Sequence, residues 1–128
     1  MEDDPLRQQL NSIRAISARS PDGALAELDN IISQGVESVE VWMLKACIHF
    51  QRDEHSLAVK AFSKVIIREP KSEGASLGLF HSLWSGGDED AAFEEMKRFF
   101  REAGLDNKSQ TAQDYWAIVK EINEQSNT

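Results

Sequence analysis

Apolar residues recur along this chain at intervals of three and four residues, the spacing that places side chains on one face of an α-helix. In the segment from 58 to 70, Ala58, Phe62, Val65 and Ile66 stand at positions i, i+4, i+7 and i+8, and Pro70 ends the run. Apolar residues also occupy the positions 34 residues before and 34 residues after these four. They are Ala24, Leu28, Ile31 and Ile32 in the earlier segment and Ala92, Met96, Phe99 and Phe100 in the later one. The sequence therefore predicts three amphipathic helices at a fixed repeat distance.

Residues typical of helix ends flank these three segments. Ser20 can cap the start of the first helix, and Gly35 follows its end. Asp88 can cap the third helix, and Gly104 follows it. Pro70 ends the middle helix because its ring lacks a backbone N–H and cannot continue helical hydrogen bonding. These capping and helix-ending residues agree with the helix boundaries that the apolar pattern predicts.

Four further helices are expected around these three. They span residues 5–17, 39–52, 73–85 and 111–122, and the first three follow the N-cap candidates Asp4, Ser38 and Ser72. The last segment carries an apolar face made of Tyr115, Ile118, Val119 and Ile122. We expect it to cover the open end of a helical stack, because a terminal repeat needs a cap with a polar outer surface. The predicted fold class is all-α, with seven helices and no strand.

The middle unit resembles the tetratricopeptide repeat family, whose unit is a helix–turn–helix of about 34 residues. Trp42, Ala46, Ala58, Phe62 and Pro70 stand at the spacings of the family signature. The resemblance implies a right-handed α-solenoid of three helix pairs with a C-terminal capping helix. The chain is then one domain, residues 1–128, made of repeats 5–36, 38–70 and 72–104, a capping helix 109–123 and a frayed tail 124–128.

The first helix of each pair departs from the family pattern. The family phase would bury Lys45 and His49 in the middle unit and Asn11 in the first unit, and such burial of polar groups is costly. We therefore expect the first helices to slide or rotate relative to the template. Their solvated faces should then line the concave groove.

On that basis, polar residues at helical spacing on the first helices mark a candidate partner-binding groove. The set comprises Arg7, Asn11, Arg14, Lys45, His49, Arg52 and His81. A locally basic groove would receive an acidic or carboxylate-bearing segment of a protein or peptide partner. The alternative interpretation is that these residues form ordinary solubilising faces. Phe50 and Trp84 lie near helix ends and are candidate apolar anchors, although aromatic residues at helical spacing are more often part of the core.

The composition and motifs of the sequence argue against several classes of function. The formal net charge of −8 argues against general nucleic-acid binding, which requires clustered Lys and Arg. No apolar run approaches the roughly 20 residues that span a bilayer, and the N-terminus lacks a signal-peptide pattern, so a cytoplasmic protein without membrane partners is expected. The histidines lack metal-ligand spacing, and no catalytic motif is found, so we expect neither an enzyme nor a cofactor.

Two classes of function remain open from the sequence. One is an adaptor that binds a partner segment in the groove. The other is a dedicated one-partner protein, either a toxin immunity protein or a secretion chaperone, that uses its acidic surface. The lysine and asparagine clamp by which some tetratricopeptide domains hold heat-shock chaperones is mostly missing and is rejected. A monomer or weak homodimer is expected.

Overall fold

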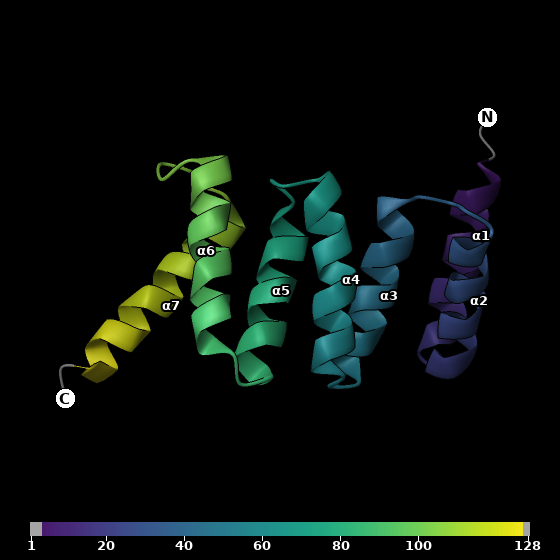
Figure 1. Cartoon of the computed structure of the whole chain (residues 1–128), viewed down its shortest axis with the longest axis horizontal. Helices are drawn as coiled ribbons and strands as arrows, with labels where there is room; N and C mark the ends of the chain where they lie inside the picture. Colours follow the sequence, from purple (N-terminus) through teal and green to yellow (C-terminus); the bar gives the residue numbers. More distant parts are fainter. Residues whose placement is uncertain (1–3, 127–128) are drawn as a thin grey trace.

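A computed structural model describes residues 4–126 of the chain. These residues form seven α-helices and no strand. The helices are α1 (Pro5–Ser17), α2 (Pro21–Ser33), α3 (Val39–Gln51), α4 (His55–Arg68), α5 (Glu73–Ser85), α6 (Glu89–Ala103) and α7 (Gln110–Ser126). Figure 1 shows them standing side by side in chain order from the N-terminus to the C-terminus. The predicted all-α fold class is confirmed.

Packing follows the order of the sequence. Each helix from α1 to α5 packs against the next along the chain, and α7 packs on α5. In addition α1 contacts α3, and α3 contacts α5. The odd-numbered helices therefore form one layer of the stack, and we call the surface of this layer the odd-helix face. In the described residues, no helix is long and apolar enough to cross a membrane.

The 34-residue pattern is confirmed as the core of the stack. The first position of the pattern, Ala24, Ala58 and Ala92, is completely buried in all three even-numbered helices. The second and third positions are nearly as buried, with exposed fractions of 0–6% at Leu28, Phe62, Met96, Ile31, Val65 and Phe99. The repeat of small and large apolar residues thus corresponds to a repeated packing interface between helices.

Side-chain caps begin most of the helices where the sequence predicts them. Asp4, Ser20, Ser72 and Asp88 each accept a hydrogen bond from a backbone N–H in the first turn of α1, α2, α5 and α6. Ser38 precedes α3 but does not cap it in this way, because its hydroxyl donates to the Glu40 carboxylate at 2.8 Å.

The first helices of the pairs differ in how their polar residues are placed. On α1, Leu10 and Ile13 are buried while Asn11 is exposed, as expected for a helix rotated away from the family phase. On α3 the expected rotation is wrong, since His49 is only 6% exposed. Its Nδ1 lies 2.8 Å from the Glu54 carboxylate, and this polar partner offsets the cost of burying the imidazole.

The C-terminal helix is longer than the sequence predicts. It continues to Ser126, so the prediction of a frayed tail from residue 124 is wrong as far as 126, and residues 127–128 lie outside the described part of the chain. Tyr115 anchors α7 to the stack, because it is fully buried and its hydroxyl lies 2.7 Å from the Ser76 hydroxyl on α5. The helix therefore covers the end of the core, as expected for a cap.

Candidate functional site

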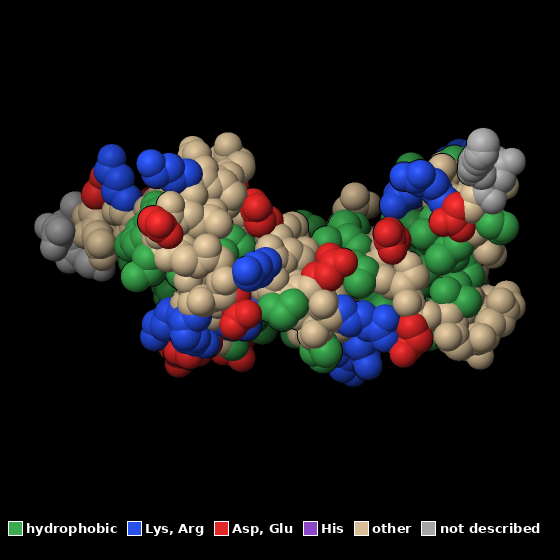
Figure 2. Space-filling view, turned by 90° about the horizontal axis from the view of Figure 1, so that it is seen from above, with side chains coloured by type: hydrophobic (Ala, Val, Ile, Leu, Met, Phe, Trp, Pro, Cys, Tyr) green, Lys and Arg blue, Asp and Glu red, His purple; other side chains and the backbone are tan. Residues whose placement is uncertain are grey.

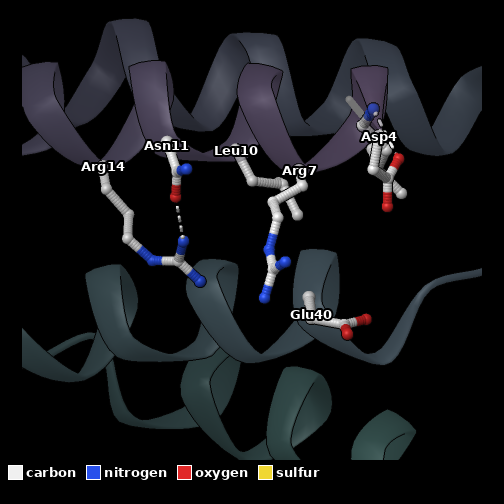
Figure 3. Close-up of a pocket in the computed structure, with 7 residues that line it drawn as sticks. Asp4, Arg7, Leu10, Asn11, Arg14 and Glu40 are labelled. Carbon is white, nitrogen blue, oxygen red and sulfur yellow. Dashed lines mark hydrogen bonds between the residues drawn. The ribbon is translucent and has the colours of Figure 1, made fainter. Parts of the chain in front are cut away.

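A pocket of about 340 Å³ opens on the odd-helix face between α1 and α3. Arg7, Asn11 and Arg14 line it from α1, because residues three and four apart lie on the same side of a helix. Glu40 lines it from the first turn of α3. Figure 3 shows the two arginine side chains extending from α1 toward α3, with Glu40 across the gap. The structure thus brings together the three residues that the sequence placed at this end of the groove.

Two basic side chains, Arg7 and Arg14, and two acidic side chains, Asp4 and Glu40, line this pocket. Arg14 donates from Nη1 to the amide oxygen of Asn11 at 3.0 Å, a neutral partner that leaves its charge uncompensated. Neither Arg7 nor Arg14 forms an ion pair within residues 4–126. Asp4, at the rim of the pocket, accepts the capping hydrogen bond of Leu6 N–H.

Glu40 is held in its charged form. The hydroxyl of Ser38 and the backbone N–H of Glu40 itself donate to the carboxylate, and these hydrogen bonds hold its pKa below the ordinary value. Burial acts in the opposite direction, and the charges of Arg14 and Arg7 lower the same pKa by smaller amounts. The pocket therefore presents two guanidinium groups together with the side chains of Glu40 and Asp4. Planar guanidinium groups suit carboxylate or phosphate oxygens, which they can bind in pairs.

The basic residues of α3 occupy a different side of the stack from the one expected. Lys45 Nζ lies 2.7 Å from the Asp29 carboxylate, and Arg52 Nη1 lies 2.6 Å from the Asp22 carboxylate, both on α2. Successive residues of an α-helix are rotated by about 100° around the helix axis. Lys45, His49 and Arg52 therefore lie about 120–180° around the axis of α3 from Glu40. They therefore do not extend the stripe formed by Arg7, Asn11 and Arg14, and their charges are already paired.

A second pocket, of about 380 Å³, opens between α5 and α7. His81 and Trp84 line it from α5, and Ile118 and Ile122 line it from α7. Trp84 stacks on Phe80 with ring centroids 5.9 Å apart, which fixes the orientation of the indole. Glu121 and Gln125 of α7 also line this pocket, so its lining combines apolar and polar side chains.

The remaining candidates fall outside these two pockets. Phe50 is 38% exposed at the end of α3 and packs edge-on against Phe62, with centroids 6.4 Å apart. Ser82, the neighbour of His81 on α5, is buried and donates to the carbonyl of Gly78 at 2.8 Å. Phe50 therefore remains a solvent-accessible aromatic residue without a surrounding pocket among those described.

Sequence reasoning missed part of both pockets. Glu40 is absent from the predicted groove, although its position two residues after the Ser38 cap candidate is a signal for a carboxylate held by a hydrogen bond. Ile118 and Ile122 stand four residues apart and were assigned to the buried face of the last helix. They are partly exposed because α5 and α7 leave an opening between them.

The described residues offer little reactive or metal-binding chemistry. In the described residues, no cluster of three or more His, Cys, Asp or Glu side chains could hold a metal ion. Burial raises the pKa of the Cys47 thiol, and the charge of Arg14 opposes this effect only partly. On the face that Figure 2 shows, acidic, basic and apolar side chains are interspersed rather than gathered into one region of a single sign.

No family model, curated protein or solved structure gives a significant match to this chain.

Proposed function

We propose that this protein is a non-catalytic interaction module that binds an acidic or carboxylate-bearing segment of a partner protein on its odd-helix face. The observation that carries the proposal is the pocket between α1 and α3, where Arg7 and Arg14 line an opening and neither forms an ion pair within residues 4–126. Asp4 and Glu40 line the same opening. A carboxylate of a partner could accept charge-assisted hydrogen bonds from these unpaired guanidinium groups.

The geometry favours recognition by charge-assisted hydrogen bonds. The two guanidinium groups are a full helical turn or more apart on α1, and Asn11 stands between them as a further amide donor. All three side chains are exposed, so water screens their charges and each contact contributes modestly. We therefore expect selectivity for acidic segments with affinities in roughly the micromolar range.

The pocket between α5 and α7 gives the same face an apolar anchor. Trp84, Ile118 and Ile122 provide apolar surface that can accept a hydrophobic side chain of the same partner segment. A bound segment would cross α3 and α5 on its way from the charged pocket to the apolar one. Tetratricopeptide repeats, which this chain resembles in its 34-residue spacing, also present helical layers to partner segments, and this support is by analogy of fold alone.

The proposal can be tested with a phage library of random 12-residue peptides selected on the intact protein. Peptides rich in Asp, Glu or a free C-terminal carboxylate should be enriched. Their affinity, measured by fluorescence anisotropy, should fall at least about tenfold for Arg7→Glu/Arg14→Glu, because the charge that attracts the carboxylate is reversed.

A matched variant separates this effect from a general change of charge. Arg19→Glu/Lys60→Glu reverses two exposed basic residues outside the pocket and should leave affinity within about twofold of wild type at physiological salt, where the Debye length is near 8 Å. Circular dichroism should show both variants folded. Enrichment of peptides without acidic groups, or equal losses in the two double variants, would contradict the proposal.

A further inference from the structure

A third opening, of about 590 Å³, lies at the C-terminal end of the stack between α6 and α7. Its lining consists of Met96, Lys97, Phe100, Arg101, Leu105 and Trp116. Figure 1 shows the far end of α7 splaying away from α6 rather than running alongside it. We call this opening the terminal cleft; it is separate from both pockets of the odd-helix face.

The residues that face the neighbouring helix differ in size between α5 and α7. On α5, the positions that face α4 are the small residues Gly78 and Ser82, so the two helices approach closely. The residue 34 positions after Ser82 is Trp116 on α7. Its indole meets the ring of Phe100 on α6, with centroids 5.1 Å apart and an interplanar angle of 39°. An indole thus stands on α7 where α5 carries a hydroxymethyl group, and it lines the cleft.

Large apolar side chains are left uncovered at the terminal cleft. Leu105 is 73% exposed and Trp116 is 48% exposed. Burial of apolar surface is favourable, which makes uncovered side chains of this size candidates for contact with a partner.

The charged side chains at the terminal cleft indicate which kind of partner segment fits it. Lys97 and Arg101 stand four residues apart on α6, and both line the opening. Lys97 pairs with Glu94 at 3.2 Å, but both side chains are about two thirds exposed, so the pair is weak and exchangeable. Arg101 forms no ion pair in the described part of the chain. Apolar side chains next to two basic side chains fit a partner segment that is apolar on one side and acidic on the other.

We propose that the terminal cleft is a second docking surface, which takes an acidic amphipathic helix of a partner protein. Apolar side chains of that helix pack against Trp116 and Leu105, and its Asp or Glu residues lie against Lys97 and Arg101. A second copy of this chain is a poorer occupant, because two chains each carrying a formal charge of −8 repel one another. This proposal does not depend on ligand binding at the odd-helix face.

The test uses a display library of 20-residue helical peptides with Leu at the i, i+3, i+4 and i+7 positions and the flanking positions randomised. Selection on the intact Arg7→Glu/Arg14→Glu protein removes ligands of the charged pocket. Peptides with Asp or Glu along one flank should be enriched. Replacing those acids by Lys, or introducing Leu105→Glu or Arg101→Glu into the protein, should weaken binding at least about tenfold by anisotropy. The Lys peptide should regain affinity for the Arg101→Glu protein.

Ile67→Glu is the matched control, because Ile67 is 76% exposed on α4, away from the terminal cleft, and its replacement should leave binding unchanged. Failure to enrich any peptide, enrichment without acidic residues, or equal loss in Ile67→Glu and Leu105→Glu would overturn the proposal. Light scattering provides a second measurement. A dimer that dissociates in Leu105→Glu would also overturn it, since the occupant would then be another copy of the chain.

Discussion

The packing of Gly78 against Phe62 leads to a specific prediction about the stability of the protein. A Cβ added at Gly78 would lie 2.4, 2.6 and 2.9 Å from three ring atoms of Phe62. Contacts between carbon atoms are normally about 3.5–4 Å, so the ring would have to move by roughly 1 Å. Phe62 is 3% exposed in the core between α4 and α5, where little free space exists for that movement. Gly78→Ala should therefore destabilise the protein.

Two opposing effects set the size of the change. Alanine is favoured over glycine within a helix by about 1 kcal/mol. Overpacking of a dense core costs about 1–3 kcal/mol. We expect a net loss of up to about 2 kcal/mol in the free energy of unfolding, measured by urea titration with far-ultraviolet circular dichroism.

Gly74, on the same helix, is the matched control. A Cβ there would lie 3.5 Å from the Met43 terminal methyl, an ordinary contact, so Gly74→Ala should be neutral or stabilise by up to about 1 kcal/mol. Phe62→Leu should reduce the cost of Gly78→Ala in a double-mutant cycle, because the branched side chain leaves more room. If Gly78→Ala proves as stable as wild type, the close approach of α5 to Phe62 is not a feature of the folded protein.

Three further predictions concern polar groups in the interior. Tyr115→Phe should lower stability by about 1–3 kcal/mol in urea titrations, because the buried Ser76 hydroxyl loses its partner at 2.7 Å; Ser76→Ala/Tyr115→Phe should recover part of the loss. Burial raises the pKa of the Tyr115 phenol, although its hydrogen bond with Ser76 opposes this. The unfolded chain thus releases this proton near pH 10 while the folded chain retains it, and stability should fall above about pH 10 less steeply in Tyr115→Phe than in wild type. Arg98→Ala should lower the free energy of unfolding by about 2–3 kcal/mol, because the Glu95 carboxylate, 5% exposed, loses two hydrogen bonds of 2.7 Å. This range is below that of fully buried ion pairs because Arg98 is partly exposed. An unchanged urea midpoint would contradict the prediction. Cys47 should react with a thiol reagent at least about tenfold more slowly in the native protein than in urea, because burial raises its pKa and limits access; equal rates would show that the thiol is exposed.

The sequence by itself determined the helices and the repeated core. The apolar pattern at Ala58, Phe62 and Val65 recurs every 34 residues, and the same positions are buried in each even-numbered helix. Caps such as Ser20 and Asp88 were also predictable, because they depend on neighbours within one turn. These features are local or strictly periodic, so each can be read from a short stretch of chain.

Which polar residues line a pocket depends on how the helices pack together. Arg14 and Lys45 have the same kind of helical spacing, but Arg14 lines the pocket between α1 and α3 while Lys45 is paired with Asp29 on α2. The rotation of a helix about its own axis depends on side chains that neighbouring helices supply from 15 or more positions away in the sequence. The terminal cleft has the same origin, since Trp116 and Phe100, which line it, meet across a helix boundary.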